Sequence, residues 1–276
     1  MTRFHILRRT IQILVALVFL FLPWLGITQI AGSLFALQIG PIPFADPVAT
    51  LSVVATGTLP NVRLLAGAGI TLLIAFFLGR VFCGWICPYG LFSEWIHAFH
   101  TRKRPLSFAH ALFTKCVILV VCVQLFALCA LPILGLCSYP GALSLIPIAI
   151  WEEAGAAIFL SLGLAPFLTL CAEAISGERL WCRFVCPQSV LLGLSAWLLP
   201  KQSPGLRIRW QAKQCTCKEN PACVAACSLR LSPRHSTGPN RLHCIQCGEC
   251  VLACAKHGKA LSWSLTPSTK AKKTCP

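Results

Sequence analysis

The sequence predicts a mainly α-helical membrane protein with four transmembrane helices and a small soluble domain at its C-terminal end. The chain has 276 residues, of which 56% are hydrophobic and 12% are charged. Its mean hydropathy of +0.73 is too high for a soluble globular protein. Long apolar runs occur only before residue 200. Residues 201–276 hold nine cysteines and no run long enough to span a bilayer.

Four apolar runs are long enough to cross a membrane. The first covers residues 11–30 and follows three arginines. No small-residue cleavage site follows it, which favours a retained helix over a signal peptide. The other predicted spans are residues 64–82, 116–136 and 154–175.

The segments between the spans are predicted to be loops and one surface helix. Residues 31–61 are rich in proline and residues 137–153 hold two more prolines, so both are expected to be external loops. In residues 91–99 the apolar side chains recur near helical spacing, which predicts a short amphipathic helix on the membrane surface. His97 and His100 are expected on the solvated face of this segment.

The basic residues predict the orientation. With four spans, the arginines and lysines fall on one side of the membrane, except for Arg63. Since basic loops stay in the cytoplasm, both chain ends are expected there. We therefore predict a multi-pass protein of the bacterial cytoplasmic (inner) membrane, with a membrane domain at residues 1–200 and a cytoplasmic domain with a basic tail at residues 201–276.

A repeated phrase marks the cytoplasmic end of the second and fourth spans. An aromatic residue precedes a Cys-x3-Cys-Pro sequence at Cys83 and Cys87, and the pattern returns at Cys182 and Cys186. Cysteines four residues apart share one face of a helix. Two such turns side by side would offer four thiolates, the number that an iron–sulfur cubane needs. The alternative is that these are buried apolar cysteines.

The strongest metal signal lies near the C-terminus. Cys244, Cys247, Cys250 and Cys254 have the x2-x2-x3 spacing of bacterial ferredoxins. Structural zinc is the alternative, but zinc usually takes two separated pairs of ligands. The sequence therefore predicts a ferredoxin-like domain that binds at least one 4Fe-4S cluster.

A second, less regular set of cysteines precedes it. The set is Cys215, Cys217, Cys223 and Cys227. It keeps the final x3 step of a ferredoxin run but not the x2 steps. In a two-cluster domain, one cluster would be bound by Cys223, Cys254 and one or both of Cys215 and Cys217. The second cluster would be bound by Cys227 and the first three cysteines of the other run.

The sequence lacks the motifs of several other kinds of functional site. There is no Cys-x-x-Cys-His for haem attachment, no nucleotide-binding glycine motif and no catalytic triad. The net charge of +16 is accounted for by membrane orientation, so no nucleic-acid partner is expected. No catalytic residue can be named from the sequence.

The two cysteine phrases, the four spans and the trailing ferredoxin domain resemble the NapH family of membrane ferredoxin-type proteins. Residues 46–60, DPVATLSVVATGTLP, look like the first external loop of that family. The resemblance implies a quinol dehydrogenase subunit of a periplasmic nitrate reductase system. Its partners would be the membrane quinone pool and redox subunits of iron–sulfur or cytochrome c type.

Related families leave alternatives open. NosR and CcoG usually carry further domains, and the irregular spacing of the upstream cysteines keeps a methylamine-utilisation role like that of MauN possible. A cluster or metal maturation protein and a membrane redox sensor are the other readings. The electron-transfer subunit is the main prediction.

Overall fold

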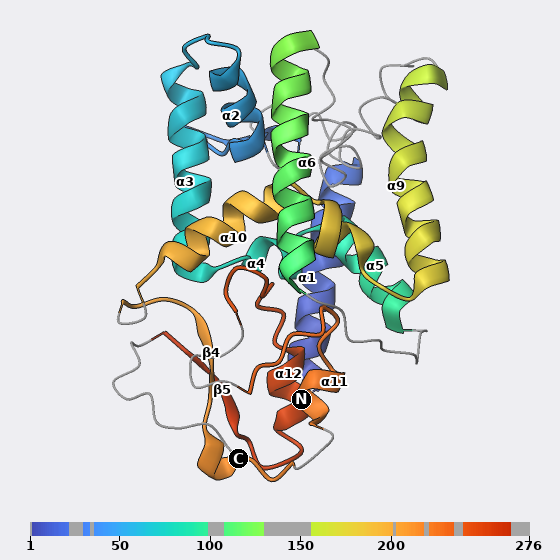
Figure 1. Cartoon of the computed structure of the whole chain (residues 1–276), viewed down its shortest axis with the longest axis vertical. Helices are drawn as coiled ribbons and strands as arrows, with labels where there is room; N and C mark the ends of the chain where they lie inside the picture. The colour runs from blue at the N-terminus through green and yellow to red at the C-terminus, as the bar shows by residue number, and fades with distance from the viewer. Residues whose placement is uncertain are drawn as a thin grey trace.

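The computed structural model has three layers along its long axis (Figure 1). Long helices stand upright in one half, short helices lie across the middle, and a cysteine-rich unit forms the other end. The structure describes residues 2–21, 30–33, 36–98, 108–129, 156–200, 203–217, 221–234 and 240–265. The predicted loop at residues 137–153, His100 and the basic tail lie outside these ranges.

The upright layer contains the four helices α1 (Thr2–Phe21), α3 (Val62–Leu78), α6 (Phe108–Cys129) and α9 (Ala156–Ser176). Their outer faces are apolar, and Leu73 and Phe167, for example, are 57% and 62% exposed. Among the described residues, two segments have the length and hydropathy of a membrane span, Phe4–Phe21 and Ala111–Leu128. The apolar parts of α3 and α9 that the structure describes in full, Val62–Leu78 and Pro166–Ser176, are shorter than such a span, so two of the four predicted spans are supported.

The second predicted span is broken by Gly79. The apolar run at residues 64–82 forms α3 and then the short helix α4 (Val81–Trp85). Gly79 has a φ of 74°, a conformation that favours glycine, and its N–H donates to the carbonyl of Ala75 at 2.8 Å. The chain therefore turns before the first cysteine of the motif, and α3 has 17 residues.

Residues 31–61, predicted as an external loop, contain regular structure that was not predicted. They contain a three-stranded antiparallel sheet, in the order β1 (Ile30–Ser33), β2 (Ala36–Ile39) and β3 (Ile42–Pro43). Helix α2 (Pro47–Ala55) follows and packs against α3 and α6. The prolines are compatible with this, because Pro47 occupies the first helical turn, where its missing N–H costs nothing. Asp46 caps the helix, and its Oδ1 accepts from Val48 N at 2.7 Å.

The crosswise layer repeats itself. The first motif contributes α4 and α5 (Pro88–Ala98), and the second contributes a π-helical turn η1 (Trp181–Val185) and α10 (Gln188–Leu198). Both α5 and α10 have 11 residues. Helix α5 packs on α1 and α9, and α10 packs on α3 and α6. The repeat therefore extends beyond the cysteine phrase to a helix after each copy, and we did not predict α10 from the sequence.

Helix α5 agrees with the prediction on its apolar side and differs from it on its polar side. Its polar side is buried, with Ser93, Glu94 and His97 at 1%, 7% and 9% exposure. Phe92 and Trp95 are instead 41% and 46% exposed. The expectation of a solvated His97 is wrong, because its Nδ1 lies 3.0 Å from the carbonyl oxygen of Gly177. Arginines from other elements face this side and make its burial possible.

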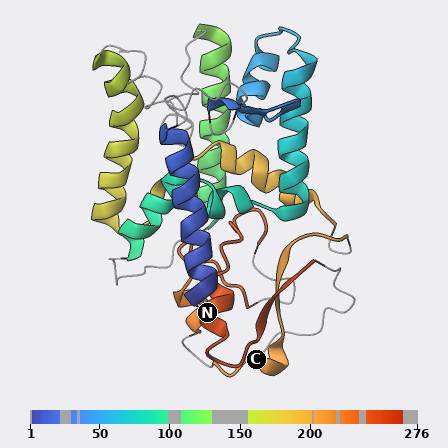
Figure 2. The ribbon, with the colours of Figure 1, turned by 180° about the vertical axis from the view of Figure 1, so that it is seen from behind.

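The cysteine-rich unit has little regular structure. A two-stranded antiparallel sheet joins β4 (Arg207–Trp210) and β5 (Leu261–Ser264), with Trp210 opposite Leu261. The other elements are η2 (Ala212–Gln214), α11 (Ala222–Ala225) and α12 (Glu249–Cys254). A small core of apolar side chains and cysteines lies between them. Figure 2 shows the start of α1 beside this unit.

Candidate metal centres at the layer junction

The four cysteines of the repeated motif meet where the crosswise layer touches the cysteine-rich unit. Cys87 and Cys186 are buried in one cluster with Trp181. Cys83 and Cys182 pack against the core of the cysteine-rich unit. Burial is the main cause that raises the pKa of Cys87, and the neighbouring thiols of Cys83 and Cys182 raise it further. The fold thus brings both copies of the motif into one neighbourhood.

Cationic groups surround these thiols. Arg179 Nη2 donates to Cys182 Sγ at 3.6 Å, and Lys115 Nζ donates to the carbonyl of Cys182 at 2.8 Å. Both cationic residues are 2% exposed. Burial raises the pKa of Cys186 to about 12, so a free thiolate there is costly. A bound metal together with these cations would offset that cost.

A second cysteine group lines a small cavity in the cysteine-rich unit. Its thiols come from Cys227, Cys244, Cys247 and Cys250. The backbone N–H of Leu231 donates to Cys227 Sγ at 3.3 Å, an arrangement that tunes ligand sulfurs in metal sites. Burial raises the pKa of Cys244 to about 12. These four are the residues that the sequence predicts as one cluster's ligands.

The remaining cysteines form a looser group. Cys223 and Cys254 are buried in the same core, and the pKa of Cys223 is raised by burial and next by Cys254. Cys215 packs against this core. Its Sγ lies 3.9 Å from the carbonyl oxygen of Cys217, so both candidates for the first ligand remain near the group.

A cubane and a single ion place different demands on these cysteines. Within the described part of the chain, no three His, Cys, Asp or Glu side chains are close enough to share one metal ion. Zinc requires four ligands around one atom. In a cubane each cysteine binds a different iron, so the thiols stand farther apart. Cys227, Cys244, Cys247 and Cys250, with a cavity between them, offer the four thiols that a cubane needs.

The first motif rests directly on the loop that carries the ferredoxin spacing. Trp85 Nε1 donates to the carbonyl of Gln246 at 3.1 Å. Arg80 Nη1 donates to the carbonyls of Leu242 and His243, each at 3.3 Å. Gly84 comes so close that a Cβ there would lie 2.4 Å from the carbonyl oxygen of Ile245. The two groups of cysteines are therefore neighbours across one interface.

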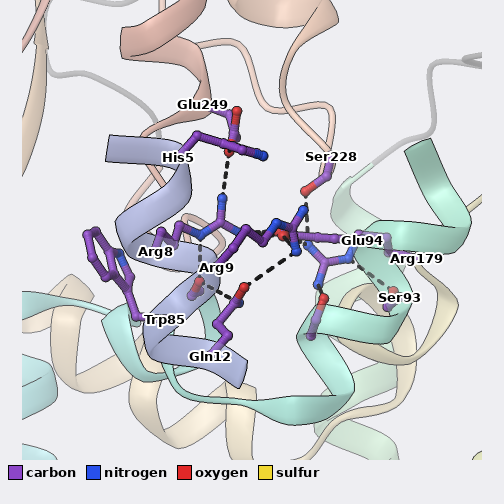
Figure 3. A network of polar contacts seen from close by, with 12 residues as sticks. His5, Arg8, Arg9, Gln12, Trp85, Ser93, Glu94, Arg179, Ser228 and Glu249 are labelled. Carbon is purple, nitrogen blue, oxygen red and sulfur yellow. Dashed lines mark hydrogen bonds and ion pairs between the residues drawn. The ribbon is translucent and has the colours of Figure 1, made fainter. Parts of the chain in front are cut away.

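A buried ionic network holds this interface together (Figure 3). Arg8 pairs with Glu94 and with Glu249, the latter at 2.7 Å, and its Nε donates to the Gly84 carbonyl at 2.8 Å. Arg179 approaches Glu94 at 3.4 Å from the other side. The network joins α1, α5, the second motif and α12.

Sequence reasoning missed these residues. Arg8 was counted among the basic residues before the first span, and Glu94 fell within the predicted surface helix. A charged residue within an apolar helical run was the available signal, since such a residue needs a buried partner. Glu173 gave the same signal. It is 1% exposed, and its Oε1 accepts from Trp181 N at 2.9 Å, so α9 holds the start of the second motif.

Known proteins share the parts of the sequence that form these sites. A family described as 4Fe-4S binding domain matches residues 60–107 and 159–204, which contain the two copies of the Cys-x3-Cys-Pro motif. The ferredoxin-type protein NapH of Haemophilus influenzae is 27% identical over 92% of this chain and 88% of its own length. The predicted resemblance to NapH is confirmed. NapH of Escherichia coli is 26% identical over 92% of this chain and 87% of its own length.

Similarity to MauN is more local. The methylamine utilization ferredoxin-type protein MauN of Methylorubrum extorquens is 37% identical over 32% of this chain and 31% of its own length. The two NapH proteins align along nearly the whole chain, so the likeness to them includes the cysteine-rich unit. No solved structure matches the chain significantly.

Proposed function

We propose that this chain is an electron-transfer subunit of the bacterial cytoplasmic membrane that oxidises quinol and passes the electrons toward a periplasmic redox system such as nitrate reductase. The observation that carries the proposal is the meeting of Cys83, Cys87, Cys182 and Cys186 between the apolar helices and the cysteine-rich unit. The similarity to NapH over nearly the whole chain favours nitrate reduction over methylamine utilisation as the pathway.

The proposal includes a topology. Helices α1, α3, α6 and α9 would each cross the membrane, with both chain ends and both motifs on the cytoplasmic side. The α3 helix, at 17 residues, is at the short end of what spans a bilayer. The exposed apolar faces of these helices and the burial of arginines at the other end of the molecule support this placement.

The proposal also assigns the ligands. The four motif cysteines would hold one cluster, and Cys227 with the first three cysteines of the ferredoxin run would hold a second. Cys223 and Cys254, with Cys215 or Cys217, would hold a third. When bound, such clusters supply one-electron acceptors in series.

The reaction balances with these acceptors. A quinol gives up two electrons and two protons and becomes a quinone. The electrons leave one at a time and end on a periplasmic partner of iron–sulfur or cytochrome c type, and the protons go to water. The chain's own residues enclose the thiols, and Arg179 and Lys115 supply positive charge beside them.

Quinol-driven reduction of the purified protein tests the function. In proteoliposomes, a reduced quinol added anaerobically should bleach the cluster absorbance within seconds. Serine at any one of the four motif cysteines should slow this step equally, while dithionite still reduces the cysteine-rich unit. Cys122→Ser is the matched control, because that cysteine is buried in α6.

Two results would count against the proposal. The first is that replacing Cys182 or Cys186 leaves quinol-driven reduction unchanged while replacing Cys83 or Cys87 abolishes it. This result would contradict a shared site. Absence of quinol-driven reduction in the unaltered protein would favour a maturation or sensing role.

A further inference from the structure

An apolar cavity lies beside the first motif. Its volume is about 390 Å³, within the range of small-molecule sites, which is about 300–1,000 Å³. Described residues of α1, β2, α3, α4 and α10 line it, together with Phe44, Gly79 and Ile86. Figure 2 shows α1 and α3 on either side with α10 between them.

The cavity opens toward the outside of the upright layer. Ile74 and Leu78 line it and are also 45% and 40% exposed on the apolar face of α3. A ligand could therefore enter sideways from a membrane without crossing water. An amphiphile with an apolar tail fits this entrance, and a water-soluble substrate does not.

The side chain of Phe82 connects the cavity to the thiol cluster. Phe82 lines the cavity and also packs against the cluster of Cys87 and Cys186. Ile86, the residue before Cys87, lines it as well. A ring bound at this end would lie against the motif that is proposed to receive electrons, and a lipid acyl chain would gain nothing from that position.

A buried polar side chain, that of Gln246, lies beside one of the lining residues at the same end. Gly79 lines the cavity, and a Cβ built on it would lie 3.3 Å from Gln246 Cγ. Gln246 is 1% exposed, and its Oε1 has no hydrogen-bond partner within the described part of the chain. A buried amide oxygen without a partner is costly, and a ligand hydroxyl would satisfy it.

We propose that this cavity binds the ring and the first isoprenoid units of a membrane quinol, with the ring at the Gly79 end near Phe82. This assignment rests on the proposed function and gives its substrate a place. The apolar walls hold the tail, and the carboxamide of Gln246, in the loop of the ferredoxin spacing, accepts from a ring hydroxyl.

Direct binding tests the site. The probe is a heptyl hydroxyquinoline N-oxide, a fluorescent quinol analogue, titrated into the full-length protein in nanodiscs. Ile74→Trp fills the cavity from its rim and should weaken binding about tenfold or more. The control is Leu73→Trp, because Leu73 is 57% exposed on the same helix and does not line the cavity. Its affinity should equal that of the unaltered protein.

A second variant guards against misfolding. Gln246→Leu keeps the size of the side chain and removes the acceptor, so it should weaken analogue binding severalfold while the iron content stays unchanged. Equal affinity in all variants would overturn the site. Displacement of the analogue by ordinary phospholipid at bilayer concentration would identify a lipid site and would also overturn it.

The redox assay separates this inference from the proposed function. If quinol reduces the unaltered protein and the Ile74→Trp variant at the same rate, the function stands and the cavity is not the site. If the analogue binds in an Ile74-dependent way but quinol reduces neither protein, the proposed function fails and the binding site stands.

Discussion

The guanidinium of Arg179 lies 3.6 Å from the sulfur of Cys182 and also donates to Ser228 Oγ at 2.9 Å, one residue after Cys227. One buried cation thus touches the repeated motif and the neighbourhood of a cysteine in the other unit. A positive charge beside an anionic centre favours the reduced state, which carries one more electron.

Arg179→Gln should therefore lower the reduction potential of the motif centre, by roughly 60 mV if the change in affinity for the electron is tenfold. The variant should also lose stability by about 2 kcal/mol or more, because Ser93, Gly90 and Glu94 lose a buried donor. An EPR-monitored redox titration measures the first effect. Arg63→Gln, on the exposed start of α3, should leave the potential unchanged.

Gly84→Ala should separate the two units. A Cβ there meets the carbonyl oxygen of Ile245 at 2.4 Å, and backbone on both sides must move apart. We expect a loss of about 1–3 kcal/mol in the free energy of unfolding, with slower electron transfer between the units. Gly69→Ala is the matched control, since a Cβ at Gly69 meets nothing within 4 Å. If both variants transfer electrons at the same rate, the interface is not the electron path.

The pairing of Cys227 with the ferredoxin run can be tested by spectral comparison. Cys227→Ser should alter the same EPR signal as Cys247→Ser, because both thiols line one cavity. Cys254→Ser should alter a different signal, because Cys254 neighbours Cys223. If Cys227→Ser and Cys254→Ser instead alter the same EPR signal, the cysteines are divided between the clusters in another way.

The four-span topology predicts cytoplasmic ends. A reporter fused after Pro276 should be active only if the reporter works in the cytoplasm, because the basic residues lie on that side. A second fusion after Thr58, between α2 and α3, should be active only as a periplasmic reporter. If a periplasmic reporter fused after Pro276 is active, the predicted topology is wrong.

The apolar runs located α3 and α9 to within a few residues, whereas α1 and α6 begin well before their predicted starts at residues 11 and 116. Orientation within an element was harder. The polar side of α5 was expected in solvent but is buried, because Glu94 pairs with Arg8 and Arg179. A partner 86 residues away in the chain leaves no local signature.

The sheet at β1–β3 and helix α2 were missed for a different reason. Proline density was taken as evidence against a spanning helix, and shorter elements were not considered, although Pro47 is at a position where a helix accepts it. The cavity could not be predicted, since its walls come from five elements that are far apart in the sequence. Among its lining residues, Gly79 is the one whose positive φ explains the residue type.

The pairing of Arg8 with Glu249 has a consequence for how the protein is made. The two residues are 241 positions apart, so a ribosome adding about 5–20 residues per second makes the partner roughly 12–48 seconds later. In the last part of that interval, after Cys186 is made, the nascent chain has all four motif thiols, but the unit that packs against Cys83 and Cys182 is not yet complete. Iron and sulfide delivered in this window would meet open sites, and delivery after docking would have to reopen the junction.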